Sequence, residues 1–291
     1  MTERFAADWL ALREPFDHAA RSVALARRLA DRLPRRPRLL DLGAGTGSMF
    51  RFLAPIVGRG QDWILLDSDP ALLDEAFGRT ASWARARHYA ATAQDDELLV
   101  TTPQGLWRVR AVLGDIARPL SLSSLPGPGR PGNDNGKQPA VDAVICSALL
   151  DLVSAAWLAG LRKTLAVPFL ACLTADGRDV WRPHHPYDAL VRTAFRRDMR
   201  RDKGFGPALG TAAPHALATG TSTPSDWHIP RRALRMQRAL IDGAADAARR
   251  AQPSRAEAIT AWQEARLRQA LRGRLAITVG HRDILVLPQG G

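Results

Sequence analysis

Three glycines alternate with small residues in the segment Asp41-Leu42-Gly43-Ala44-Gly45-Thr46-Gly47. A short apolar run, residues 38–42, leads into this segment, and a helical apolar pattern over residues 49–57 follows it. A glycine-rich turn between a strand and a helix lets the backbone approach a ligand closely, and the start of the helix offers it unpaired N–H groups. The spacing therefore predicts a ligand-binding loop.

Polar side chains end three further apolar runs that read as strands. Asp67 and Ser147 each close such a run, and Asp115 follows another in Gly114-Asp115-Ile116. Because the carboxyl ends of parallel strands meet at one edge of a sheet, we expect these side chains to lie near the glycine loop. Each one alone could equally terminate a strand or begin a turn, so the prediction depends on their occurring together.

The glycine spacing separates two kinds of nucleotide cofactor. A dinucleotide fingerprint has the pattern G-x-G-x-x-G, but here the glycines stand at positions 43, 45 and 47 and Ser48 follows, which disfavours a NAD-type oxidoreductase. The segment instead resembles the first motif of class I S-adenosylmethionine-dependent methyltransferases, and the resemblance extends over roughly residues 37–175. It implies methyl transfer with S-adenosyl-L-methionine as cofactor. A non-catalytic module that only binds this cofactor is an alternative.

The resemblance also implies roles for the residues at the strand ends. Asp67 is expected to bind the ribose hydroxyls, and Asp115 is expected to bind the adenine amino group while Ile116 covers the adenine ring. Ser147 is expected to lie near the methionine portion. The full set of expected cofactor-binding residues is Asp41, Gly43, Ala44, Gly45, Gly47, Asp67, Ser68, Asp115, Ile116 and Ser147.

The order of the patterns predicts an α/β protein with a Rossmann-like, central, mostly parallel seven-stranded sheet and helices on both faces. We expect an N-terminal helical lead-in at residues 1–36 and the cofactor-binding core at residues 37–184. Residues 185–291 are expected to add C-terminal helices that cover the substrate, together with the last strands of the sheet.

Several segments carry more specific predictions. The runs 97–102 and 106–113 flank Pro103-Gln104-Gly105 and predict a hairpin whose second arm is the third core strand. Other expected features are a crossover helix from Asp151 to Leu165, a surface loop at 119–139, helices near 187–202, 231–251 and 254–272, a strand near 216–229, and closing strands at 275–279 and 284–287.

Transfer of a methyl group mainly requires alignment of the acceptor and exclusion of water, so a general base matters only for a weakly nucleophilic, protonated acceptor. Four candidates follow the predicted strands, namely Asp151, Asp176, His184 and His185. Asp151 could instead favour the start of a helix, and the histidine pair could be a solvated connector between two prolines. No further His or Cys accompanies the pair at metal-ligand spacing, so no metal is expected.

A basic segment, residues 188–203, carries Arg192, Arg196 and Arg200 on one helical face. One interpretation is an anion site for the substrate, built from Arg192, Arg196 and Lys203, with Phe205 in a flexible glycine-containing lid. The other is a solvated helix face. The aromatic residues Trp181 and Trp227 could likewise line a pocket or belong to the core.

The formal charge of +12 suggests nucleic acid as a partner. Nearly all of this charge comes from arginines spread along an alanine-rich chain, a composition that codon bias would also produce, so the charge is weak evidence for such a partner. After the fourth core strand the chain reads Cys146-Ser147-Ala148-Leu149-Leu150, without the Asp/Asn-Pro-Pro-aromatic motif of nucleic-acid amino methyltransferases. A small-molecule acceptor is therefore favoured, with RNA or protein bound through residues 188–203 as the alternative. We expect no membrane span and a cytoplasmic protein with reduced cysteines.

Overall fold

The computed structural model describes residues 6–94, 97–117 and 141–288. Its central sheet has nine strands in the order β3-β4-β5-β2-β1-β6-β7-β12-β9. The strands are β1 (Arg38–Leu42), β2 (Gln61–Asp67), β3 (Ala90–Gln94), β4 (Glu97–Thr102), β5 (Gly105–Leu113), β6 (Ala143–Ser147), β7 (Phe169–Ala175), β9 (Thr221–Pro224) and β12 (His281–Val286). The predicted count of seven strands is wrong, because β3 and β4 extend the sheet as antiparallel strands beyond β5.

The five strands at the centre of the sheet, β5, β2, β1, β6 and β7, pair in parallel. In chain order they form the pattern 3-2-1-4-5, so the direction of the connections reverses between β1 and β6. Ligands of open α/β sheets bind beyond the carboxyl ends of the strands at such a reversal. The edge formed by Leu42, Asp67, Leu113, Ser147 and Ala175 is therefore where a site is expected.

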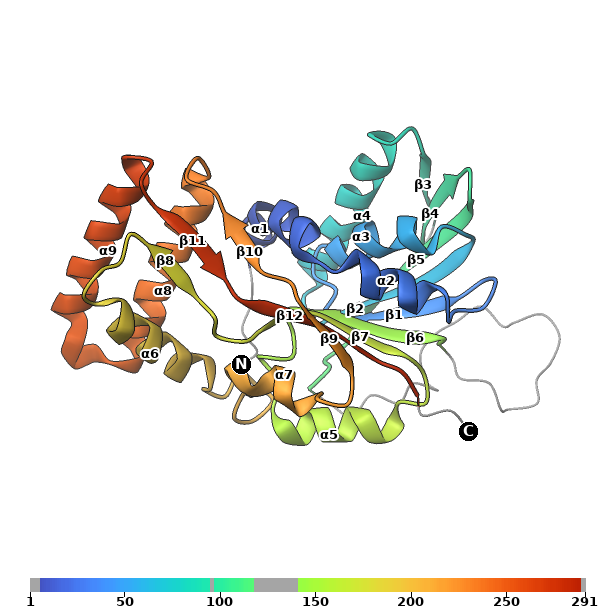
Figure 1. Cartoon of the computed structure of the whole chain (residues 1–291). Helices are drawn as coiled ribbons and strands as arrows, with labels where there is room; N and C mark the ends of the chain where they lie inside the picture. The colour runs from blue at the N-terminus through green and yellow to red at the C-terminus, as the bar shows by residue number, and fades with distance from the viewer. Residues whose placement is uncertain (1–5, 95–96, 118–140, 289–291) are drawn as a thin grey trace.

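Helices cover both faces of this sheet, as predicted (Figure 1). On one face lie α2 (Val23–Ala30), α3 (Ser48–Val57) and α4 (Pro70–Arg85), whose apolar side chains pack on alternate strand residues such as Leu39 and Leu65. On the other face α5 (Ala155–Thr164) and the short α7 (Ala213–Ala216) pack against Leu40 and Ile64. Strands buried on both faces explain why the central runs are apolar without alternation.

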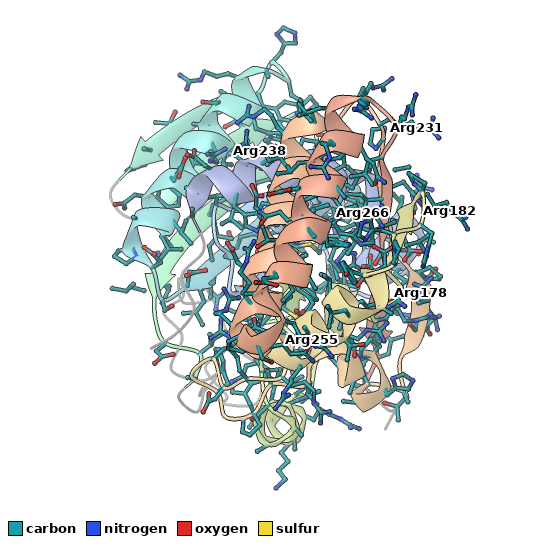
Figure 2. All side chains as sticks on the ribbon, turned by 90° about the vertical axis from the view of Figure 1, so that its left-hand side faces the viewer. Arg178, Arg182, Arg231, Arg238, Arg255 and Arg266 are labelled. Atoms are coloured by element: carbon teal, nitrogen blue, oxygen red, sulfur yellow. The ribbon has the colours of Figure 1, made fainter. Side chains whose placement is uncertain are left out.

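A second, three-stranded sheet adjoins the first, in the order β10-β11-β8. Its strands are β8 (Val180–Arg182), β10 (Trp227–Ile229) and β11 (Ala276–Val279), and the helices beside it are α6 (Asp188–Met199), α8 (Leu234–Ala251) and α9 (Ala256–Leu271). In Figure 2 the exposed Arg182, Arg231, Arg238 and Arg255 lie at different places around these helices, whereas Arg266 is fully buried. The Arg266 guanidinium bonds to Asp188 and to the Pro183 carbonyl, at 2.6 Å for the latter, and so ties α9 to the start of α6.

Several element boundaries differ from the prediction. The crossover helix begins at Ala155 and not at Asp151, because the Ser154 hydroxyl caps it by accepting a hydrogen bond from Trp157 N at 3.1 Å. The last strand begins at His281 and not at residue 284, directly after β11 of the other sheet. The predicted loop at 119–139 falls outside the described residues. Within the described part of the chain, no helix is long and apolar enough to cross a membrane.

Candidate functional site: two adjoining cavities

The glycine loop joins β1 to α3 and adopts a backbone that favours glycine at all three positions. Gly43, Gly45 and Gly47 have φ values of 67°, 53° and 78°, in the left-handed region that side chains disfavour. The N–H groups of Gly43 and Ala44 donate to the Leu66 carbonyl at 2.9 and 3.0 Å, which fixes the loop against the end of β2. A larger residue at position 45 would also meet the Leu10 side chain, 3.1 Å from the added carbon.

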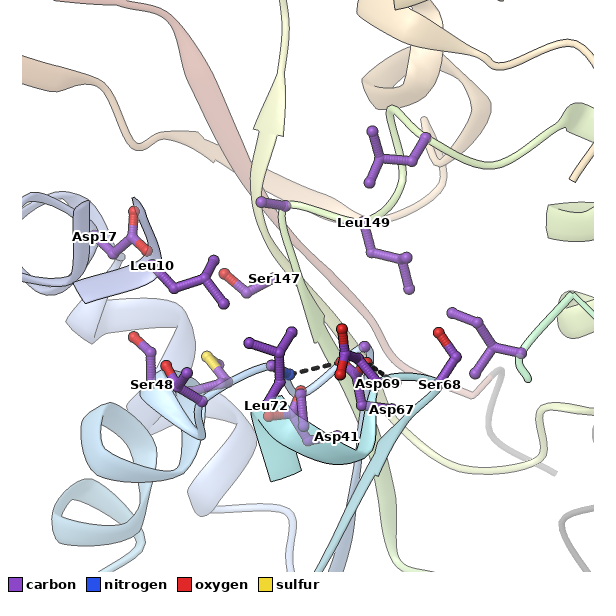
Figure 3. Close-up of a pocket in the computed structure, with 18 of the residues that line it drawn as sticks. Leu10, Asp17, Asp41, Ser48, Asp67, Ser68, Asp69, Leu72, Ser147 and Leu149 are labelled. Carbon is purple, nitrogen blue, oxygen red and sulfur yellow. Dashed lines mark hydrogen bonds between the residues drawn. The ribbon is translucent and has the colours of Figure 1, made fainter. Parts of the chain in front are cut away.

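Asp67 at the end of β2 is hydrogen-bonded to this loop (Figure 3). Its Oδ2 accepts a hydrogen bond from Gly45 N at 2.8 Å, and its Oδ1 accepts one from Asp69 N at 3.0 Å. Burial raises the pKa of Asp67, and these backbone N–H groups partly oppose the shift. A carboxylate has about four acceptor positions, so two N–H groups leave room for further donors.

Asp41 at the end of β1 is buried beneath the loop. Its Oδ2 has no hydrogen-bond partner among the described residues. The pKa of Asp41 is raised to about 8, because burial and the nearby Asp67 raise it more than the Arg21 guanidinium lowers it. Asp41 also lines the cavity, and its carboxyl group is suited to a cationic group of a ligand.

Helix α1 (Ala7–Ala20) contributes to the wall of this cavity. Leu10, Arg13 and Asp17 lie along one face of it, and Arg21 follows directly after its end. The buried Arg21 guanidinium donates to the Ser147 hydroxyl at 3.0 Å and to the Ser48 hydroxyl at 3.1 Å. These residues were missed in the sequence, although their spacing of three and four residues places them on one face of a helix.

Nine of the ten residues expected around a cofactor line this one cavity, which has a volume of about 150 Å³. We call it the loop cavity. Gly47, the tenth, lies outside its lining and forms the N-cap of α3. Asp115 also accepts a hydrogen bond from Ala117 N at 2.9 Å, and Ile116 is buried with its carbonyl bonded to Trp157 Nε1 at 2.6 Å.

A second and larger cavity, about 660 Å³ in volume, lies between the two sheets and the C-terminal helices. We call it the aromatic cavity, because Trp9, Trp181, Phe195, Trp227 and Trp262 contribute to its wall. The two cavities share four lining residues, Arg13, Ala148, Leu152 and Lys203. A molecule in one cavity would therefore lie next to a molecule in the other.

The four candidates for a general base separate into two pairs. Asp151 and His184 line the aromatic cavity. Asp176 lies outside its lining and pairs with Arg178 at 2.5 Å. His185 also lies outside, where its Nδ1 accepts a hydrogen bond from Tyr187 N at 3.2 Å.

The expected substrate residues are distributed between the cavities. Arg192 lines the aromatic cavity and Lys203 lines both, whereas Phe205 lines the loop cavity and packs on Trp157. Arg196 lines neither, because its guanidinium donates to the Gly177 carbonyl. The segment predicted as a flexible lid is a turn in which the Asp202 carboxylate accepts hydrogen bonds from Gly204 N and Gly206 N at 2.7 and 3.0 Å.

Comparison with known proteins gives structural likenesses only. No family model matches the sequence, and no curated protein matches it. Similar solved structures include a protein from Anaeromyxobacter dehalogenans named as a type II methyltransferase (17% identity, 93% of this chain and 98% of that one, TM-score 0.47). They also include S-adenosylmethionine-dependent methyltransferases with bound S-adenosylhomocysteine from Thiobacillus denitrificans (16%, 99% and 100%, 0.43) and Geobacter sulfurreducens (16%, 92% and 90%, 0.41). Identities and scores this low indicate a likeness of fold and carry no function to this chain.

Among the described residues, no group of three or more His, Cys, Asp or Glu side chains is placed to hold a metal ion. Both cysteines, Cys146 and Cys172, are buried in the central strands, where burial raises the pKa of each thiol. Thiols of this kind pack as small apolar groups.

Proposed function

We propose that this chain is an S-adenosylmethionine-dependent methyltransferase that binds its cofactor in the loop cavity and a small-molecule acceptor in the aromatic cavity. The observation that carries the proposal is the shared wall between the cavities, one of which is lined by the glycine loop and the acids at the strand ends. Methyl transfer requires two ligands held in contact with their reacting atoms aligned. Two adjoining cavities at the carboxyl edge of a doubly wound sheet meet that requirement.

The polar groups of the loop cavity fit the parts of this cofactor. Asp67 keeps acceptor positions for the ribose hydroxyls, and Asp115 with the buried Ile116 offers an acceptor and an apolar surface for adenine. The carboxyl group of Asp41 suits the cationic amino group of the methionine portion, with Ser147 on the same cavity wall. Each assignment uses a group that is oriented by the fold before any ligand binds.

When bound, the cofactor supplies a methyl group on a positively charged sulfur, which an acceptor atom can attack directly. The chain then has three tasks. Helix α1 and Leu149 cover the loop cavity and exclude water. The tryptophan side chains orient the acceptor in the aromatic cavity. Asp151 and His184 line that cavity and are placed to take a proton from an acceptor that carries one.

The shape and lining of the aromatic cavity favour a small molecule over a macromolecule. Its volume lies in the range of about 300–1,000 Å³ of pockets that enclose small ligands, and its wall combines aromatic side chains with charged ones such as Asp151, Asp179 and Arg192. Four of the six cations in the basic segment 188–203 are bonded within the protein or line a cavity. Arg196 bonds to a backbone carbonyl, Arg201 pairs with Asp198 at 3.4 Å, and Arg192 and Lys203 line the cavities.

Calorimetry with S-adenosylmethionine, S-adenosylhomocysteine and NAD tests the cofactor. We expect the first two to bind and to raise the melting temperature, since a ligand at 100 times its Kd stabilises a protein by about 2.7 kcal/mol. The variant Asp74→Asn, which replaces an exposed acid on α4, is the control, and it should bind these ligands like the wild type. Binding of NAD alone would overturn the proposal in favour of an oxidoreductase. Salt-sensitive binding of tRNA at submicromolar concentration would overturn the small-molecule acceptor.

A further inference from the structure

Two opposite charges in the wall of the aromatic cavity are not neutralised by the described residues. Asp179 directly precedes β8 and Arg192 lies on α6, and both residues line the cavity. The strand and the helix both lie at the left of Figure 1. Asp179 is half-buried and Arg192 is exposed, and neither forms an ion pair with another described residue. The wall therefore offers one acidic and one basic contact to a molecule in the cavity.

The Asp179 carboxyl group is held in position but lacks a paired cation. Its Oδ1 accepts a long hydrogen bond from Gly280 N at 3.4 Å. Its Oδ2 accepts none from the described residues and keeps accessible surface. Burial raises the pKa of Asp179, and Asp176 raises it further. The Gly280 N–H and the charges of Arg196 and Arg192 lower this pKa only in part. A carboxylate withdrawn from water without a paired cation is destabilised, so a cationic group of a ligand would bind here favourably.

Other charges of the same wall are already paired within the protein. Three acids are each bonded to an arginine, namely Asp188 to Arg266, Asp198 to Arg250 and Asp246 to Arg249. Arg13 is bonded to Asp17 at 3.0 Å. These groups need no ligand to balance their charge, whereas Asp179 and Arg192 remain available to one.

Each of the two charges is accompanied by an aromatic residue on its own element. Trp181 follows Asp179 by two residues, the spacing that places side chains on one face of a strand. Phe195 follows Arg192 by three residues, the spacing of neighbours on a helix face. Both aromatic residues line the cavity and are half-buried, so each keeps accessible surface. The strand and the helix thus each present one charge and one aromatic ring.

A ligand that matches this wall carries a cation, an anion and an apolar ring. A molecule with a single charge could pair with Asp179 or with Arg192 but would leave the other without a partner. The Arg192 charge acts on the pKa of Asp179 although the two do not pair, so they lie near each other. The cation and the anion of the ligand must then also be close together, as they are on the α-carbon of an amino acid.

Resting on the proposed function, we propose that the methyl acceptor is an aromatic amino acid, or a derivative that keeps both of its charged groups. The ammonium group binds the Asp179 carboxylate, and the carboxylate binds the Arg192 guanidinium. The ring lies against Trp181 and Phe195. Asp179 and Arg192 are thereby the residues that select the acceptor by its charges.

Three indole compounds test this on the unmodified protein, by calorimetry with and without S-adenosylhomocysteine. L-Tryptophan carries both charges, tryptamine carries only the ammonium group, and indole-3-propionate carries only the carboxylate. L-Tryptophan should bind about ten-fold more tightly than either analogue, because it makes one more charged hydrogen bond. Equal or tighter binding of an analogue, or no binding of L-tryptophan, would overturn the inference.

Substitution then assigns each contact to its residue. In Asp179→Asn the affinity for tryptamine should fall about ten-fold, whereas that for indole-3-propionate should change less than about two-fold. In Arg192→Gln the two analogues should exchange these responses, and L-tryptophan should bind more weakly to both variants. The asparagine can still accept the hydrogen bond from Gly280 N, so Asp179→Asn keeps the local backbone contact.

Two matched controls replace charges of the same kind nearby. Asp246 is an exposed acid of the same cavity wall that is already paired, and Arg197 is an exposed arginine of α6 outside the cavity lining. Asp246→Asn and Arg197→Gln should bind all three compounds like the wild type. Equal losses in these controls, or equal loss of all three compounds in Asp179→Asn, would contradict the assignment. Binding of S-adenosylhomocysteine is scored separately, so its absence would overturn the proposed function and leave the two ionic contacts standing.

Discussion

Asp41 should release a proton when the cofactor binds. Its carboxyl group is fully buried, and burial raises its pKa to about 8 in the ligand-free protein. At pH 6 the group is then about 99% protonated, while the α-amino group of the cofactor, with a pKa near 8, carries its charge. A cation beside this carboxyl group favours the carboxylate over the acid, so binding expels the proton.

The size of the effect follows from linkage. If the bound cation brings the pKa of Asp41 down to about 5, about 0.9 proton leaves per cofactor bound at pH 6. Because the free protein holds more protons than the complex, a rise in pH favours binding, and the association constant should increase about eight-fold between pH 6 and pH 7. In Asp41→Asn no proton is available, so this increase should disappear.

Calorimetry at pH 6 in two buffers with different ionisation enthalpies measures the number of protons released. The wild type and Asp74→Asn, an exposed acid on α4, should give the same number, and Asp41→Asn should give a number near zero. Release of less than about 0.3 proton by the wild type would refute the reasoning about Asp41. So would an unchanged release in Asp41→Asn.

The same pKa affects the stability of the ligand-free protein. The pKa of Asp41 in the folded state lies above its ordinary value of 3.8, so the stabilising contribution is fully present below pH 4 and is lost as the pH rises toward 8. The slope is about 1.4 kcal/mol per pH unit. Urea denaturation between pH 5 and pH 7 should therefore show a steeper loss of stability in the wild type than in Asp41→Asn, and parallel curves would contradict the raised pKa.

Three further substitutions have expected outcomes. Asp67→Asn should weaken binding of S-adenosylmethionine by about 1–3 kcal/mol, because it removes charged hydrogen bonds; unchanged affinity by calorimetry would exclude Asp67 from the site. Gly45→Ala should lower the free energy of unfolding by about 1–2 kcal/mol, since φ is 53° and the added carbon meets Leu10, and a urea midpoint equal to that of the wild type would contradict this. Arg51→Met should cost about 3 kcal/mol, because Arg51 is buried and bonds to Glu14 at 2.7 Å. The half-buried pair of Arg79 and Glu75 provides the control, with an expected loss below about 1 kcal/mol for Arg79→Met.

The parts of the fold that were predictable are those with long apolar runs. Strands β1, β2, β6 and β7 are buried on both faces, so each carries an apolar run that is easily recognised. Strand β3 was missed because its residues, Ala90–Gln94, are small or polar and mostly exposed at the sheet edge. In the small sheet, β11 matches the closing strand predicted at 275–279 and β10 lies within the strand predicted near 216–229, whereas β8 is three residues long, too short to show a period.

The residues of the candidate site were likewise predictable only in part. The expected cofactor residues gather in one cavity because parallel strands end at a common edge, which the order of the elements already implies. The spacing of Arg21 with the residues of α1 indicated a helix face, but its bond to Ser147 was not predictable, because it depends on packing between segments far apart in sequence. Arg192 and Arg196 lie one turn apart on α6, yet only Arg192 faces a cavity; spacing identifies a helix face but not what lies opposite it.

Helix α1 borders both cavities, with Arg13 in the wall of each. Any ligand that orders this helix acts on both sites at once. Equilibrium linkage then requires reciprocity: the factor by which the cofactor changes the affinity for the acceptor equals the factor by which the acceptor changes the affinity for the cofactor. In the proposed methyl transfer the cofactor loses the charge of its sulfonium group but keeps that of its amino group, so its contacts with the helix change while the acceptor side is still filled. Through the fourteen residues of α1, the affinity for one product would then depend on whether the other is still bound.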